Sequence, residues 1–489
     1  MGVVLLVPIL APLVAAALAA VVGWRRLSSY LTVGAALTVL VTGVVLAAGA
    51  GPDPLYGAGS LLRADALSVT MLLVIGTVGT LATWASVGYI DAELAHGHTD
   101  SPGARLYGVL MPLFLAAMAL AVLANSIGVM WVAIEATTVA TAFLVGHRRT
   151  RAALEATWKY VVICSVGIAL ALLGTVLLYA VSLHAGASSS RALDIDVLLG
   201  HAAQLDPAVT RLAAGLLLLG YGAKAGLVPF HTWLADAHSQ APAPVSALMS
   251  GVLLSVAFSA LLRVKSIVDL ALGAGFLRTG LLIVGLLTLL IAASLLFVQT
   301  DFKRMLAYSS MENMGIVAIA AAAGTELAIV ALLLHVLAHG VAKALVFLAA
   351  GQLQAAHGST AIRDVTGVLT RSPLIGGAFA VGLAVLIGLP PFAMFASEVS
   401  ISRALAGAHL GWVLGVMLVL IAVAFAALVR NGGRMLLGPA NLGSPAIAVP
   451  RSVAGALVAG IILSLVLGLT AGPLTDLFRS AATLLGASR

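Results

Sequence analysis

Long apolar stretches recur along the chain and are separated by short polar segments. A transmembrane helix needs about 20 consecutive, mostly apolar residues, and windows of that length predict about fourteen membrane spans. The predicted spans lie near residues 3–22, 30–49, 65–90, 104–123, 126–146, 157–182, 208–230, 243–264, 277–298, 302–323, 326–350, 373–400, 410–429 and 452–472. The alternating pattern of a membrane β-barrel is not evident. We therefore expect an all-α polytopic membrane protein.

The composition excludes several classes of protein. Of the 489 residues, 62% are hydrophobic and 9% are charged, whereas soluble domains are about 45–50% apolar and about 25% charged. This argues against a soluble globular enzyme, a disordered chain and a nucleic-acid-binding domain. The net charge of +7 comes from only 25 Lys and Arg residues, which we interpret as topology signals.

The N-terminal apolar stretch resembles a signal peptide, but it lacks a basic segment before it. Arg25 and Arg26 follow the stretch instead, so residues 1–22 are predicted to form the first span. With both termini outside, more of the Lys and Arg residues fall in the inner loops, including the dense HRRTR cluster at residues 147–151. Residues 184–206, the longest polar segment, are expected to form an external loop.

The single cysteine, Cys164, limits the chemistry of this chain. A four-cysteine iron–sulfur or zinc site cannot form within it, and neither can a disulfide framework. No P-loop or dinucleotide-binding glycine motif is found in the sequence. We therefore expect no redox cofactor to be held by this chain alone.

Ionisable residues inside the predicted spans are the strongest functional signal. Each costs about 2.5–3.5 kcal/mol on insertion scales. One buried charge can simply pair two helices, but seven of them spread over several helices of one bundle predict a connected polar path. These residues are Glu135, Lys224, Glu312, His335, His339, Lys343 and Glu398.

Three of these residues share one helical span. His335, His339 and Lys343 are spaced four residues apart and lie on one face over about 12 Å. Histidine titrates near neutral pH, so the pattern favours a proton relay. Two histidines four apart can also chelate a metal, but no third ligand lies in the motif and the lysine opposes a cation.

Proline interrupts the span that contains Lys224. Pro229 cannot donate to the carbonyl of Ala225, and such breaks are tolerated in a membrane where they line protein or a water-filled cavity. Burial would lower the pKa of Lys224 and a nearby carboxylate would raise it, so this lysine is a candidate proton carrier. The simpler alternative is a proline kink with a lysine that reaches the interface.

A second break has a similar sequence. GLVPF at residues 226–230 and GLPPF at 388–392 are 162 residues apart. With five spans in each unit, spans 4–8 and 9–13 would form two inverted repeats, and interrupted helices at matching positions point to a transport pathway. The predicted organisation is spans 1–3 at residues 1–103, repeats at 104–266 and 267–430, and span 14 at 431–489.

Three long segments carry a resemblance to a known family. They are GAKAGLVPFHTWLADAHSQAPAPVSALMSGVLL (222–254), DFKRMLAYSSMENMG (301–315) and HVLAHGVAKALVFLAAG (335–351). They resemble the antiporter-like subunits of respiratory complex I, of multi-subunit sodium/proton antiporters and of group 4 hydrogenases. SSMENMG with Glu312, and GLPPFAMFASE with Glu398, are most similar to the F-type membrane component of hydrogenase-4.

The resemblance implies a role for each candidate residue. Glu135 would tune the pKa of Lys224, the central carrier of the first half. His335, His339 and Lys343 would lead into the second half, and Glu398 would be the terminal carrier. The resemblance also implies proton entry near His238 and a bridge between the halves in the eighth span. Many relatives have a lysine at that bridge, whereas this chain has Ser255, so the continuity of the relay depends on Ser255 and water.

The leading hypothesis is a proton-translocating, non-catalytic subunit of a redox-driven complex in a prokaryotic cell membrane. Its partners would be other membrane-arm subunits and soluble redox subunits, which would carry iron–sulfur clusters and a metal or quinone site. The alternatives are a sodium/proton antiporter subunit without a redox partner, a scaffold with a decayed channel, and a membrane partner for inorganic-carbon uptake. The transported ion is the proton in the leading hypothesis, with sodium as the other candidate.

Overall fold

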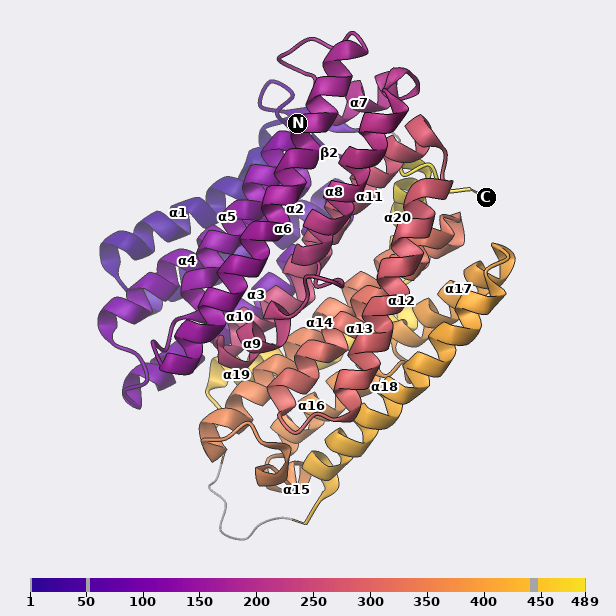
Figure 1. Ribbon diagram of the computed structural model, residues 1–489. Helices are drawn as coiled ribbons and strands as arrows, with labels where there is room; N and C mark the ends of the chain where they lie inside the picture. Colours follow the sequence, from indigo (N-terminus) through magenta and orange to yellow (C-terminus); the bar gives the residue numbers. More distant parts are fainter. Residues whose placement is uncertain (1, 50–52, 440–446, 489) are drawn as a thin grey trace.

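A computed structural model describes residues 2–49, 53–439 and 447–488 of the chain. Met1 and Arg489, which belong to the predicted terminal segments, lie outside the described residues. Figure 1 shows an elongated bundle of helices, with both termini toward the end that carries α7 and with α15 at the opposite end.

The first half of the chain begins with a short 3-10 helix and two long helices, and a hairpin separates these from the helices that follow. The elements are η1 (Gly2–Leu6), α1 (Val7–Val22), α2 (Arg26–Ala48), β1 (Leu55–Gly57), β2 (Leu62–Ala64), α3 (Ala66–Ala95), α4 (Ser101–Leu123), α5 (Ile127–Val145), α6 (Arg151–His184), α7 (Ile195–His201), η2 (Ala202–Gln204), α8 (Pro207–Lys224), α9 (Trp233–Gln240), α10 (Ala243–Leu248), the π-helix η3 (Met249–Leu253) and α11 (Leu254–Leu272).

The second half contains a second interrupted helix and ends in an amphipathic helix. Its elements are α12 (Gly275–Phe297), α13 (Phe302–Ala323), α14 (Glu326–His357), η4 (Ile362–Asp364), α15 (Val368–Arg371), α16 (Pro373–Leu386), α17 (Ala393–Gly407), α18 (Gly411–Leu437), α19 (Arg451–Thr470) and α20 (Gly472–Leu484).

Eleven helical segments among the described residues are long and apolar enough to cross a membrane. The segment Ala243–Leu272, which joins α10, η3 and α11, is one of them. The other three predicted spans also fall on helices. However, α8 carries two cations, α13 carries a polar run, and α16 has only 14 residues before its break. The prediction of a polytopic helical membrane protein is confirmed, and eleven of its spans meet the criterion of length and composition.

Several local predictions need correction. The all-α class holds, but the prediction lacked a short antiparallel hairpin of β1 and β2, in which Leu55 pairs with Ala64. The expected external loop at residues 184–206 contains the helix α7. The helix α20 follows the last predicted span, and α11 continues eight residues beyond the predicted end of its span. Hydropathy misses such short or polar elements because they carry no long apolar run.

The core lies along α3, Ala243–Leu272 and α14, whose residues are nearly all buried. By contrast, α2 and α18 expose most of their apolar side chains, as expected for helices that face lipid or another subunit. At the centre, the backbones of η3 and α14 approach so closely that a Cβ on Gly251 would lie 2.9 Å from the carbonyl oxygen of Gly340. Glycine on both helices permits this contact.

The two predicted breaks have the same backbone geometry. After α8, the amide of Leu227 donates to the carbonyl of Gly222 at 2.8 Å, and the amide of Gly226 donates to Ala223 at 3.3 Å. After α16, Leu389 donates to Ala384 at 3.0 Å, and Gly388 donates to Val385 at 3.0 Å. Each break is therefore a Schellman-type helix end with a glycine at positive φ.

This geometry corrects the expected cause of the first break. The helix α8 ends at Lys224, so Gly226 in the left-handed conformation ends it before Pro229 is reached. The corresponding residue of the second break, Gly388, is 162 residues further along the chain. The two short segments, which have similar sequences, thus also have the same pattern of backbone hydrogen bonds.

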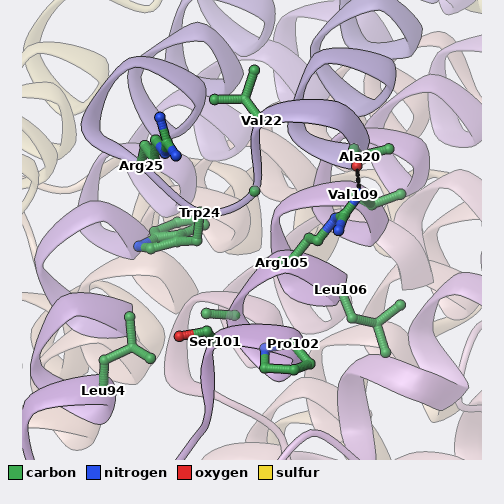
Figure 2. Close-up of a pocket in the computed structure, with 12 residues that line it drawn as sticks. Ala20, Val22, Trp24, Arg25, Leu94, Ser101, Pro102, Arg105, Leu106 and Val109 are labelled. Atoms are coloured by element: carbon green, nitrogen blue, oxygen red, sulfur yellow. Dashed lines mark hydrogen bonds between the residues drawn. The ribbon is translucent and has the colours of Figure 1, made fainter.

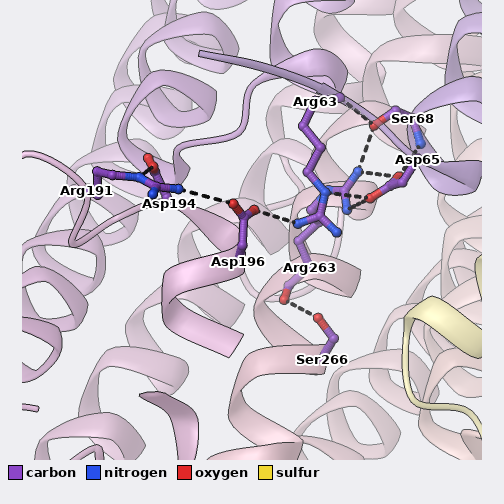
Figure 3. A network of polar contacts seen from close by, with 8 residues as sticks. All are labelled: Arg63, Asp65, Ser68, Arg191, Asp194, Asp196, Arg263 and Ser266. Carbon is purple, nitrogen blue, oxygen red and sulfur yellow. Dashed lines mark hydrogen bonds and ion pairs between the residues drawn. The ribbon is translucent and has the colours of Figure 1, made fainter. Parts of the chain in front are cut away.

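A buried ion-pair network ties together the end of the bundle near the termini (Figure 3). The guanidinium of Arg263 in α11 donates to both carboxylate oxygens of Asp65 at 2.6 and 2.8 Å, and Asp65 caps α3 by accepting from the amide of Ser68. Arg63 lies 3.2 Å from Asp65 and 3.2 Å from Asp196 in α7. The network therefore links α3, α11 and the loop helix α7.

The charge of Asp65 should contribute to stability. Burial opposes its ionisation, but the guanidiniums of Arg263 and Arg63 outweigh burial and hold the pKa of Asp65 well below its ordinary value. This stabilisation is present above about pH 4, the ordinary carboxyl pKa, and is lost as the pH falls toward the lowered value. We predict that Asp65→Asn lowers the free energy of unfolding by about 3–5 kcal/mol, because Arg263 is left buried without its counterion.

Unfolding of the chain in mild detergent, followed by circular dichroism between pH 3 and pH 7, measures this effect. Asp196→Asn is the matched control, since the Asp196 side chain is 31% exposed against 1% for Asp65, and it should cost less than about 1 kcal/mol. Equal losses in the two variants would contradict the assignment.

Candidate functional site

Lys224 lies at the end of α8, where the helix breaks inside the bundle. Its side chain is fully buried. The ammonium donates to the hydroxyl of Thr138 in α5 at 3.0 Å and to the hydroxyl of Tyr160 in α6 at 2.9 Å. Three helices therefore position this lysine, and neutral oxygens provide its hydrogen-bond acceptors.

Thr138 connects Lys224 to Glu135. The hydroxyl of Thr138 donates to Oε2 of Glu135 at 2.9 Å and accepts from the ammonium of Lys224. Glu135 is half-buried one turn earlier on α5. The predicted carboxylate partner is thus in reach of Lys224 through one hydroxyl, and no direct ion pair between them is found in the described residues. A hydroxyl that donates and accepts at once can transmit a proton.

Lys343 occupies a second buried position, on α14. Its ammonium donates to the carbonyl of Leu306 at 2.8 Å and to the hydroxyl of Ser309 at 2.5 Å, both on α13. Like Lys224, it is fully buried and bound to neutral oxygens. The bundle therefore contains two similar lysine sites, one in each half of the chain.

His335 joins α13 to α17. Its Nε2 lies 2.9 Å from Oδ1 of Asn313, and its Nδ1 lies 2.9 Å from Oγ of Ser397. The amide of Asn313 in turn donates to the carbonyl of Ser309 at 2.6 Å. A polar chain thus runs from Lys343 along α13 to His335 and on to the residue next to Glu398.

Glu312 and Glu398 flank this chain. Glu312 is 4% exposed, and its Oε2 has no hydrogen-bond partner among the described residues. Glu398 is half-buried and lies against the second break, where a Cβ on Gly388 would collide with its Oε2. The break therefore opens room for a carboxylate beside the unwound backbone.

Three further predicted residues are buried with side-chain atoms that have no hydrogen-bond partner in the described part of the chain. The ring of His238 stacks on Phe347 of α14 with 5.2 Å between centroids, and neither ring nitrogen has a hydrogen-bond partner. Nε2 of His339 and Oγ of Ser255 also have none. The structure places these residues inside the bundle but joins none of these atoms to the polar chain.

A hydroxyl pair joins the two halves close to Gly251. Oγ of Ser250 in η3 lies 2.6 Å from Oγ of Ser310 in α13. The hydroxyl of Ser310 also bonds to the carbonyl of Leu306, at 3.1 Å, which is the same carbonyl that accepts from Lys343. Ser250 therefore makes one of the polar contacts between the halves, and it lies more than one helical turn before Ser255, the bridging residue that the family resemblance implies.

Sequence reasoning missed the neutral members of these networks. They are Thr138, Tyr160, Ser250, Ser309, Ser310, Asn313 and Ser397. Hydroxyls and amides are common in helices, so their presence alone carries little information. Their clustering in the SSMEN motif was the available signal, because neighbouring polar residues are costly in a membrane span.

Among the residues that the structure describes, His335 and His339 do not form part of a larger ligand set. Across residues 2–49, 53–439 and 447–488, no group of three or more His, Cys, Asp or Glu residues is arranged to hold a metal ion. His335 instead uses both ring nitrogens in contacts with Asn313 and Ser397.

A family model described as NADH:quinone oxidoreductase/Mrp antiporter, transmembrane region, matches residues 124–426. This match covers well over half of the chain and includes both interrupted helices. The chain belongs to this family. The resemblance drawn from the three sequence motifs is thereby confirmed.

The chain is similar to a hydrogenase-4 component F homolog of Methylacidiphilum infernorum, with 39% identity over 343 residues that cover 70% of this chain and 71% of that protein. This agrees with the predicted hydrogenase-4 type. Several other curated relatives are longer, and the match spans about half of their length.

Solved structures have the same fold. A subunit of the membrane-bound sulfane sulfur reductase, an archaeal respiratory membrane complex, aligns with a TM-score of 0.88 at 24% identity over 99% of this chain and 97% of that one. A subunit of respiratory complex I from Thermus thermophilus aligns with a TM-score of 0.77 at 26% identity over 97% and 98%. Both are subunits of multi-subunit membrane complexes.

The geometry of the second break generates a prediction about Gly388. Alanine there would adopt an unfavourable φ of +63° and would collide with the carboxylate of Glu398. We expect Gly388→Ala to cost at least about 1–2 kcal/mol, the penalty for a left-handed residue with a Cβ.

Gly377→Ala is the matched control. Gly377 lies in α16 with open space around its missing Cβ, so alanine there should be neutral or should stabilise the helix by up to about 1 kcal/mol. Thermal unfolding midpoints of the two variants in mild detergent provide the comparison. A Gly388→Ala protein as stable as Gly377→Ala would contradict the proposed position of Glu398.

Proposed function

We propose that this chain is a proton-translocating membrane subunit of a redox-driven respiratory complex. The observation that carries the proposal is the pair of fully buried lysines, Lys224 and Lys343, each bonded to hydroxyls that reach toward a carboxylate or histidine. A buried ammonium without a counterion at its side is costly. Such a group suits a site that gains and loses a proton when nearby charge changes.

The proposed proton path runs through the buried ionisable residues of both halves. Glu135 modulates Lys224 through Thr138 in the first half. Lys343, His339 and His335 carry protons through the second half, with Glu312 beside them and Glu398 at the exit. His238 supports proton entry, as the family resemblance implies. The polar contacts of His335 with Asn313 and Ser397 support its place between Lys343 and Glu398.

The proposal includes fourteen spans, of which spans 4–8 and 9–13 form two inverted five-helix repeats. The shared helix-end geometry at Gly226 and Gly388 supports corresponding positions in two repeats. In this arrangement each repeat contributes a carboxylate from its second helix, Glu135 in α5 and Glu312 in α13. We also propose that both termini face the outer side, in keeping with their position at the same end of the bundle.

The chain itself would bind no electrons. Its proposed partners are other membrane-arm subunits and soluble subunits that carry iron–sulfur clusters and a metal or quinone site. This is supported by its similarity to a hydrogenase-4 component and by the fold it shares with subunits of respiratory complexes. The competing function is gradient-driven sodium/proton exchange without a redox partner, since the matching family also includes Mrp antiporters.

The test measures proton movement in inverted membrane vesicles that contain the assembled complex. Lys224→Ala should abolish redox-driven acidification while the amount of assembled complex stays the same. Thr138→Val should lower the initial rate at least about tenfold, because Lys224 loses a hydrogen bond worth about 1.5–3 kcal/mol and its link to Glu135.

Thr138→Ser and Thr137→Val are the controls. Serine keeps the bridging hydroxyl and should retain most of the activity. The hydroxyl of Thr137 bonds only to the carbonyl of Ile134 in its own helix, so its loss should have little effect. Normal pumping by Lys224→Ala would refute the proposal, and sodium-dependent, redox-independent flux would favour the antiporter.

The contact between the halves leads to a separate prediction. Ser250→Ala removes the hydroxyl that meets Ser310, so we expect it to reduce proton translocation more than Ser255→Ala does. The same vesicle assay compares the two variants, with Ser259→Ala as a control because Ser259 bonds only within its own helix. A larger effect of Ser255→Ala would contradict this prediction and would indicate that Ser255 bridges the halves, as the family resemblance implies.

A further inference from the structure

A pocket of about 680 Å³ lies away from the proton path, where α1, α3 and α4 meet. Its apolar wall includes Val22, Leu94, Leu106 and Val109, and its polar wall includes Arg25 and Arg105. Figure 2 shows Arg25 beside Trp24 on one side of the space and Arg105 on the other, with Ser101 and Pro102 below them. The volume is in the range of small-molecule sites.

The two arginines of this pocket lack counterions. Among the described residues, neither Arg25 nor Arg105 pairs with a carboxylate, whereas Arg148 and Arg304 at the same end of the bundle pair with Glu93 and Asp236. The guanidinium of Arg105 donates to the carbonyl of Ala20 in the last turn of α1. Four of its five N–H groups remain for an external acceptor.

The nearby carboxylates are already engaged and do not line the pocket. Oδ1 of Asp91 accepts from the indole of Trp24 at 2.9 Å, and Oδ1 of Asp100 caps α4 by accepting from the amide of Gly103 at 2.7 Å. The pocket therefore combines two arginines that have no carboxylate partner with an apolar wall.

Trp24 is fixed as the wall of the pocket. Besides its bond to Asp91, its ring meets the edge of Tyr107 at 5.8 Å, and a Cβ on Gly108 would lie 3.1 Å from it. A tryptophan beside arginines where apolar helices end is typical of the level of lipid headgroups. The neighbouring Tyr107 also contacts His147, which begins the basic segment between α5 and α6.

We propose that this pocket binds the phosphate headgroup of an anionic phospholipid. Arg25 and Arg105 hold the phosphate from two sides, since guanidiniums pair with phosphate oxygens in a bidentate manner. The segments of the acyl chains nearest the headgroup lie against Val109 and Leu106. This explains why a pocket with two cations also has an apolar wall. Basic pockets between transmembrane helices bind acidic lipids in this way.

The test uses the full-length chain in mild non-ionic detergent, with dioleoyl-phosphatidylglycerol as the probe and native mass spectrometry to count bound lipid. We expect the Kd of the tightest bound lipid to rise about fivefold for each arginine removed in Arg25→Gln/Arg105→Gln. Arg26→Gln is the matched control, because Arg26 is adjacent but does not line the pocket, and it should bind as the wild type does.

Val109→Trp keeps both arginines and fills the pocket, so it should also weaken binding if the pocket holds the lipid. Equal unfolding midpoints of all variants in phosphatidylcholine would establish that they are folded, and only variants that pass this check are compared.

Several outcomes would overturn the proposal. They are undiminished lipid binding by Arg25→Gln/Arg105→Gln, an equal loss in Arg26→Gln, and inorganic phosphate that competes as well as the lipid does, which would indicate a small-anion site. A photo-cross-linker at Leu106 in native membranes checks the occupant. A cross-link from Leu106 to lipid would support the proposed lipid site. A cross-link to another polypeptide would overturn it and would indicate a protein interface.

Discussion

A polar group inside an apolar bundle is tolerated only when it has a hydrogen-bond partner, and this constraint shapes the whole molecule. Helices satisfy most backbone groups internally. Where α8 and α16 stop within the bundle, the freed groups are met by the Schellman bonds around Gly226 and Gly388. Charged side chains need hydrogen-bond acceptors of their own. The helices around Lys224 and Lys343 provide oxygen acceptors for both ammoniums.

The two kinds of charged site in this protein are built differently. At the end near the termini, Arg263 meets Asp65 in a bidentate pair, and the charges compensate each other in place. In the interior, the lysine ammoniums meet hydroxyls and a carbonyl, so their charge is solvated but not neutralised. The first arrangement fixes helices in position. The second gives each ammonium hydrogen-bond acceptors without an adjacent carboxylate, which is the feature on which the proposed function rests.

Close packing of backbone brings the two halves into contact near Gly251 and Gly340. The glycines at positions 251 and 340 bring η3 and α14 together, and the π-helical turn lies at the same place. Local π-helical turns are often found at functional sites. The hydroxyl contact between Ser250 and Ser310 follows from this approach, since neither side chain is long enough to reach across a wider gap.

Much of the fold and part of the site could be predicted from the sequence. Apolar length predicted the helices, and the cost of burying charge identified Glu135, Lys224, Lys343 and their companions as exceptional. The repeated glycine–proline segments marked both breaks. These features follow from local composition and periodicity, because the membrane imposes one requirement on every span.

Only the tertiary structure decided which residues touch. Thr138 stands between Glu135 and Lys224, Asn313 and Ser397 contact His335, and Ser250 contacts Ser310 in the other half. Hydroxyls and amides can also bond to backbone carbonyls of their own helix, so their presence in the sequence does not reveal a partner on another helix. Their partners lie on helices distant in sequence, and the packing of those helices sets the distances.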